Sequence, residues 1–111
     1  MDLFAGLPVS DLGRAQDFYE RLLGAGPAFF PNDEEAVWTL DEHRHVYVLL
    51  DPERAGGGLV TLVVEDLVAR VSGIAERGIE PALDETYDNG VRKVTYRDPD
   101  GNELGFGGLP S

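Results

Sequence analysis

The chain has 111 residues, of which 42% are hydrophobic, and this length is typical of one domain with its own core. It carries 21 acidic and 9 basic residues, a formal net charge of −12, so it would repel a polyanion and nucleic acid is not expected as a partner. There is no cysteine, which excludes disulfides, zinc–thiolate sites and cysteine nucleophiles.

The first half of the chain predicts a strand, a helix and three further strands. Residues 3–9 are short and apolar, as in a strand. Residues 12–23 place apolar side chains at helical spacing, after the capping residues Ser10 and Asp11 and before Gly24, which is typical of a helix end. Polar turns then separate three short strands, expected at residues 28–30, 35–40 and 45–50.

The second half repeats this order. Residues 51–58 are rich in Pro and Gly and predict a connection, and residues 59–65 predict a β-branched strand. Asp66 is expected to cap a helix over residues 67–77, which Gly78 ends. The remaining strands are expected at residues 79–83, 90–97 and 103–107.

The two halves can be overlaid, because Val9-Ser-Asp-Leu12 matches Val64-Glu-Asp-Leu67 at the start of each helix. A strand, an Asp-capped helix with a Gly stop and three strands thus occur twice. We therefore predict a single α+β domain over residues 1–111, made of two β-α-β-β-β modules at about 1–54 and about 57–111.

Two stretches carry a family signature, the segment from Leu7 to Gly24 and the segment from Tyr96 to Phe106, which contains Asp-Pro-Asp-Gly-Asn. They resemble the vicinal oxygen chelate superfamily, which includes glyoxalase I, extradiol dioxygenases, fosfomycin-resistance enzymes and bleomycin-resistance proteins. The resemblance implies that the modules form two curved half-sheets, an open barrel around a cavity with the helices outside. It also implies a homodimer, in some members with cavities built across the dimer.

Enzymes of this superfamily usually hold a divalent metal with His, Gln and Glu from the strands that face the cavity. The resemblance places the four ligand positions at Phe4, Leu59, Gly105 and close to Tyr47. A divalent ion needs several nitrogen or oxygen donors, and these side chains do not supply them. We therefore expect neither a metal nor another cofactor.

His43 and His45 are the only histidines, and on a strand their spacing would put both on one face. Such a pair can begin a metal site, or it can form a solvated hairpin shoulder. His45 could also line the cavity and hydrogen-bond a ligand. Glu103 could reach the cavity mouth as a lone carboxylate or remain a solvated hairpin residue.

The strands are rich in aromatic residues, which can either fill a core or line an apolar pocket for a planar or cationic ligand. Gly6 and Gly105 would leave room for such a ligand. The expected ligand-binding residues are Phe4, Gly6, Trp38, His45, Tyr47, Leu59, Tyr96, Glu103 and Gly105.

These features favour a metal-free protein of the bleomycin-resistance type, which sequesters an aromatic or cationic small molecule and has no catalytic residues. One alternative is a lyase, isomerase or dioxygenase-type enzyme that uses His45, Glu103 or Tyr96 as a general acid or base. The other is a module with a filled cavity. No apolar run approaches the roughly 20 residues of a membrane span, and the start of the chain is acidic, so a cytoplasmic protein without a membrane partner is expected.

Overall fold

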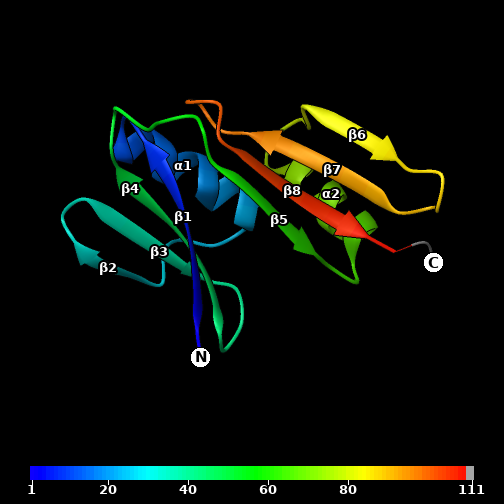
Figure 1. Cartoon of the computed structure of the whole chain (residues 1–111), viewed down its shortest axis with the longest axis horizontal. Coiled ribbons are helices and arrows are strands. Elements are labelled where there is room, and N and C mark those ends of the chain that lie inside the picture. The colour runs from blue at the N-terminus through cyan, green and yellow to red at the C-terminus, as the bar shows by residue number, and fades with distance from the viewer. Residues whose placement is uncertain (110–111) are drawn as a thin grey trace.

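The computed structural model describes residues 1–109 and contains two modules with the same order of elements (Figure 1). It confirms the α+β class and the two β-α-β-β-β modules, and the last two residues of the expected second module lie outside the described residues. The first module consists of β1 (Leu3–Val9), α1 (Leu12–Leu23), β2 (Phe29–Asn32), β3 (Glu35–Thr39) and β4 (Arg44–Leu50). The second consists of β5 (Leu59–Val63), α2 (Leu67–Glu76), β6 (Leu83–Thr86), β7 (Arg92–Arg97) and β8 (Glu103–Gly108).

Each module forms its own four-stranded sheet, with the order β1-β4-β3-β2 in the first and β5-β8-β7-β6 in the second. The first and last strands of a module pair in parallel, with Leu3 opposite Arg44 and Leu59 opposite Glu103. The other pairs are antiparallel. The two sheets do not close on each other, so the fold is an open, curved arrangement.

The helices lie together on one side of the sheets, behind them in the view of Figure 1, and a single core cluster runs through both modules. Alternate strand residues such as Leu7, Val48 and Phe106 point into this core. We call the opposite face of each sheet its inner face. The inner faces are uncovered, since Phe4 is 47% and Leu59 78% exposed.

Local signals explain the first helix. The Asp11 side chain accepts a hydrogen bond from the Arg14 amide at 3.0 Å, and Gly24 takes the left-handed conformation, with φ 81°, that ends α1. α2 differs, because Asp66 stands at its N-cap without a capping side-chain hydrogen bond. Neither helix of the described chain is long and apolar enough to cross a membrane.

The strand expected at residues 79–83 was wrong, because β6 begins only at Leu83. Ile79 is buried in the core, and its amide donates to the carbonyl of Ile74 at 3.3 Å, so this apolar residue anchors the end of α2. The helix also ends one residue earlier than predicted, at Glu76.

A buried polar network ties the two modules together. The Tyr19 hydroxyl of α1 donates to Asp98 Oδ2 in the turn between β7 and β8, at 2.8 Å. The Asn102 amide donates to Asp98 Oδ2 and to the Pro8 carbonyl of β1, and its Oδ1 accepts from the Gly58 amide. Burial and the neighbouring Asp98 raise the pKa of Tyr19, so its hydroxyl remains a donor. The modules are therefore fixed relative to one another.

Candidate ligand-binding site

A pocket of about 360 Å³ lies on the inner face of the first sheet and receives side chains from all four of its strands. This volume lies within the usual range for small-molecule sites, roughly 300–1,000 Å³. Glu35 is the only charged residue in its wall. The lining residues are Phe4, Phe29, Pro31, Glu35, Val37 and Tyr47.

Strand register explains why these side chains meet. Phe29 on β2 is opposite Val37 on β3, which is opposite Tyr47 on β4, which is opposite Gly6 on β1. Residues opposite one another share a face, so one row of aromatic and aliphatic side chains crosses the sheet. Val37 is only 1% exposed although it lies on the inner face. The row therefore forms the floor of an apolar pocket.

The space above Gly6 is not free, although the sequence suggested that it would leave room for a ligand. A Cβ atom placed on Gly6 would lie 2.5 Å from Cζ and 2.6 Å from the hydroxyl oxygen of Tyr47. The Tyr47 ring thus lies across β1 on the backbone of Gly6. The absence of a side chain at Gly6 therefore makes room for the Tyr47 ring, which is itself part of the pocket wall.

Beside the pocket, Phe4 stacks on His45, with ring centroids 4.2 Å apart and planes 15° from parallel. His45 Nε2 is 3.2 Å from one carboxylate oxygen of Asp2, and His43 Nδ1 is 2.9 Å from the other. The hydrogen bonds to the two histidines lower the pKa of Asp2. Thr39 Oγ1 lies 3.1 Å from His45 Nδ1, so both ring nitrogens of His45 have partners.

Sequence reasoning missed Asp2. The parallel pairing of Leu3 with Arg44 would have placed Asp2 beside His43, had the register been known. The two histidines hold this carboxylate. Within residues 1–109, no three His, Cys, Asp or Glu side chains are grouped so that they could hold a metal ion.

Trp38 and Tyr96, two of the expected ligand-binding residues, point to the helix side of their sheets and lie in the core. Trp38 is 2% exposed and its Nε1 donates to the carbonyl of Ala25 at 2.8 Å. Tyr96 is 1% exposed and packs against Phe106. Neither lines the inner face, because each lies two positions along its strand from a core residue and therefore points to the same side of the sheet.

Leu59, Glu103 and Gly105 lie on the inner face of the second sheet, so the structure does not bring them to the pocket of the first. Leu59 pairs with Glu103 across the parallel ladder, and Thr61 pairs with Gly105. Glu103 Oε2 is 3.1 Å from Arg97 Nε, in an ion pair on this face. The expected site residues that lie on an inner face are therefore divided between the two sheets.

The positions that the resemblance assigns to metal ligands are divided in the same way. Phe4 and Tyr47 lie on the first sheet, and Leu59 and Gly105 on the second. The Tyr47 phenol is the only oxygen-bearing side chain among the four. A donor set of this kind does not fit a divalent ion.

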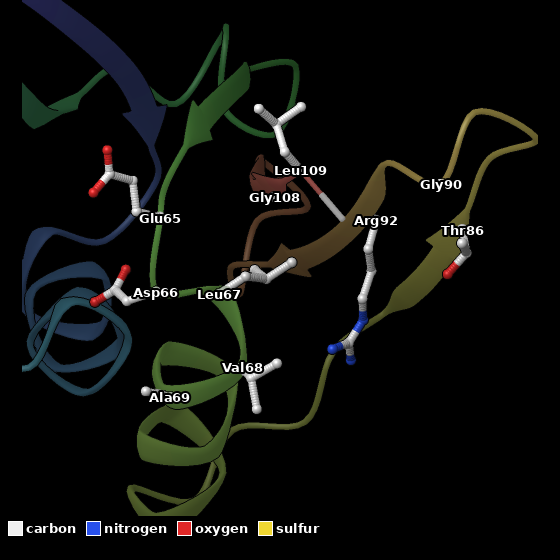
Figure 2. Close-up of a pocket in the computed structure, with 10 residues that line it drawn as sticks. All are labelled: Glu65, Asp66, Leu67, Val68, Ala69, Thr86, Gly90, Arg92, Gly108 and Leu109. Atoms are coloured by element: carbon white, nitrogen blue, oxygen red, sulfur yellow. The ribbon is translucent and has the colours of Figure 1, made fainter. Parts of the chain in front are cut away.

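A larger hollow, of about 450 Å³, lies at the start of α2 against β6 and β7 (Figure 2). Figure 2 shows Glu65 and Asp66 on one side of it and Arg92 on the other. The guanidinium of Arg92 is paired with Asp84, with Nη2 2.7 Å from Oδ2. No aromatic residue lines this hollow, so the smaller, apolar pocket on the first sheet is the stronger candidate.

Residues 3–106 match the family described as the Glyoxalase/Bleomycin resistance protein/Dioxygenase superfamily, and the chain belongs to this family. This agrees with the duplicated fold and the resemblance of its two signature segments. No curated protein sequence matches the chain.

Three solved structures show the likeness in detail. A glyoxalase / bleomycin resistance protein from Catenulispora acidiphila DSM 44928 is 55% identical, with a TM-score of 0.96 over 99% of this chain and 99% of that chain. A bleomycin-binding protein complexed with bleomycin is 22% identical, with a TM-score of 0.79 over 97% of this chain and 98% of that one. TnmS3, an antibiotic binding protein from Streptomyces sp. CB03234, is also 22% identical, with a TM-score of 0.75 over 100% and 96%. The last two show the shared fold alone.

Proposed function

We propose that the protein is a metal-free binding protein that sequesters an aromatic small molecule on the inner face of its first sheet. The open row of rings carries this proposal, since Phe4 is 47% and Phe29 44% exposed at the pocket wall. Rings held by a rigid sheet lose little conformational freedom when a planar ligand packs against them. Structural neighbours described as binding bleomycin or an antibiotic make such compounds the first to screen.

The pocket is covered, in this proposal, by a second copy of the chain in a homodimer. The second sheet leaves Leu59, Val63 and Leu83 exposed by 78%, 75% and 43% on its inner face. The two sheets of one chain do not cover each other, because both turn the same side to the helices. Covering the first sheet of each copy with the second sheet of the other would bury both apolar surfaces.

Binding without turnover is supported by the state of the three acid–base candidates. His45 is only 8% exposed and its ring nitrogens face Asp2 and Thr39. Glu103 is paired with Arg97 on the other sheet, and Tyr96 is buried in the core. No two of them converge on the pocket. Quantitative recovery of an unchanged ligand after incubation would support sequestration, whereas a converted product would favour the enzyme alternative.

A cationic aromatic ligand is the second candidate. Glu35 is the one carboxylate at the pocket wall, and the chain as a whole has a net charge of −12. The faces of Phe4, Phe29 and Tyr47 could also attract a cation, with a contribution of about 0.5–2 kcal/mol. This ligand would carry its positive group toward β3.

Phe29 and Phe30 provide a matched pair for testing the pocket. They are neighbours on β2 with 44% and 55% exposure, but only Phe29 lines the pocket. Phe29→Ala should weaken binding of the neutral fluorescent probe N-phenyl-naphthylamine about tenfold, the loss expected for one ring contact. Phe30→Ala should change it by less than about twofold. Equal losses in both variants, or no binding by the wild type, would contradict the proposed pocket.

A further inference from the structure

Lys93 is the only lysine of the chain and lies on the inner face of the second sheet. Its neighbour Val94 points into the core and is 0% exposed, so Lys93 must point the other way. It is half-buried. The same face carries the exposed side chains of Leu59 and Val63.

The lysine side chain crosses to β8 and lies over Gly105. A Cβ atom placed on Gly105 would be 2.8 Å from Lys93 Cε and 3.5 Å from Thr95 Oγ1. The absence of a side chain at Gly105 therefore makes room for the lysine. Thr61 is opposite Gly105 on β5 and Thr95 opposite it on β7. The aliphatic end of the lysine side chain thus lies over Gly105, and both residues opposite Gly105 on the neighbouring strands are threonines.

No acidic group in residues 1–109 lies within ion-pair distance of this ammonium. Arg97, the other basic residue of this face, is neutralised by Glu103. Glu85 is opposite Lys93 in the β6–β7 ladder, but the described residues contain no ion pair between the two side chains. In a chain with 21 acidic residues, this half-buried lysine has no acidic partner among the described residues, so its ammonium is available to an anion.

We propose that Lys93 binds an acidic group of the ligand, so that the sequestered molecule is an aromatic anion, such as a carboxylate, sulfonate or phenolate, and not the cationic ligand considered above. This proposal rests on the proposed function, in which the second sheet of one copy covers the aromatic pocket of the other. The rings of the first sheet hold the planar part of the ligand. The Lys93 side chain over Gly105 brings a positive charge next to the position that the resemblance assigns to a metal ligand.

Two related fluorescent probes test this charge preference. Anilinonaphthalene sulfonate is the sulfonated form of N-phenyl-naphthylamine, so the two share the aromatic body and differ in charge. Lys93→Met removes the charge at a similar size and should weaken binding of the sulfonate about tenfold, as for loss of a charge-assisted hydrogen bond. It should leave the neutral probe within about twofold. Lys93→Arg should retain sulfonate binding.

Arg14→Met is the matched control, because it makes the same change in net charge at an exposed residue of α1 that forms no salt bridge within the described chain. It should leave both affinities unchanged. Far-UV circular dichroism and melting temperatures confirm that the variants are folded. An equal loss for both probes in Lys93→Met, or no loss, would overturn the role of Lys93. A wild type that binds only the neutral probe would overturn it and leave the proposed pocket standing, whereas binding of neither probe would overturn both.

Discussion

Asp98→Ala should lower the free energy of unfolding by about 3–5 kcal/mol, because it leaves several buried donors without an acceptor. The Asp98 carboxylate accepts four hydrogen bonds, from the Tyr19 hydroxyl, the Asn102 side-chain amide and the backbone amides of Asp100 and Asn102. Tyr19 and Asn102 are both 0% exposed, so water cannot replace the lost acceptor. The variant also separates α1 from the turn of the second module.

Thermal unfolding followed by circular dichroism should show a decrease in melting temperature of roughly 12–20 °C for this variant. Tyr19→Phe removes one of the four donors and should cost only about 1 kcal/mol. Asp17→Ala removes a carboxylate whose side chain is 70% exposed and paired with Arg21, and it should cost less than about 0.5 kcal/mol. If Asp98→Ala lowers the melting temperature no more than Asp17→Ala does, the network does not contribute to holding the modules together.

Gly56→Ala should cost about 2–4 kcal/mol, through backbone strain and a collision together. Gly56 lies in the connection between the modules and has φ 94°, a conformation that side chains disfavour. A Cβ atom there would lie 2.3 Å from the backbone carbonyl oxygen of Asp100. A carbonyl held in a turn cannot rotate away as the end of a side chain can.

Gly101→Ala separates the two causes. Gly101 has φ 99°, but a Cβ atom there would have the Gly56 carbonyl oxygen, at 3.8 Å, as its nearest neighbour. It should therefore cost only the strain of the left-handed conformation, about 1–2 kcal/mol. Urea denaturation of both variants gives the comparison. Equal losses would mean that the connection relaxes and the close approach to Asp100 has no cost.

The duplicated fold could be predicted because its signals are local. The helix over residues 12–23 was confirmed, since its apolar spacing, Asp11 cap and Gly24 stop agree with one another. The strand at residues 79–83 could not be placed, since an apolar residue after a helix can either begin a strand or return to the core. Ile79 returns to the core against Ile74, a tertiary contact that the local sequence does not contain.

The candidate site was harder to predict, because strands repeat every two residues and a shift by one exchanges the faces. Phe4 and Tyr47 were expected at the pocket and lie in its wall, whereas Trp38 lies in the core. Phe29 was not among the expected ligand-binding residues, although it lines the pocket. The space beside Gly6 could not be judged from sequence, because its occupant comes from another strand.

The polar network around Asp98 joins the two modules of a chain, so their sheets move together when two copies associate in the proposed dimer. In the proposed dimer the two walls of each cavity would come from different molecules, so ligand binding and self-association would share one equilibrium. Dilution below the dimer dissociation constant should weaken the apparent affinity for N-phenyl-naphthylamine, and saturating probe should shift sedimentation toward the dimer. An affinity independent of protein concentration across that range would mean that one molecule holds its ligand alone.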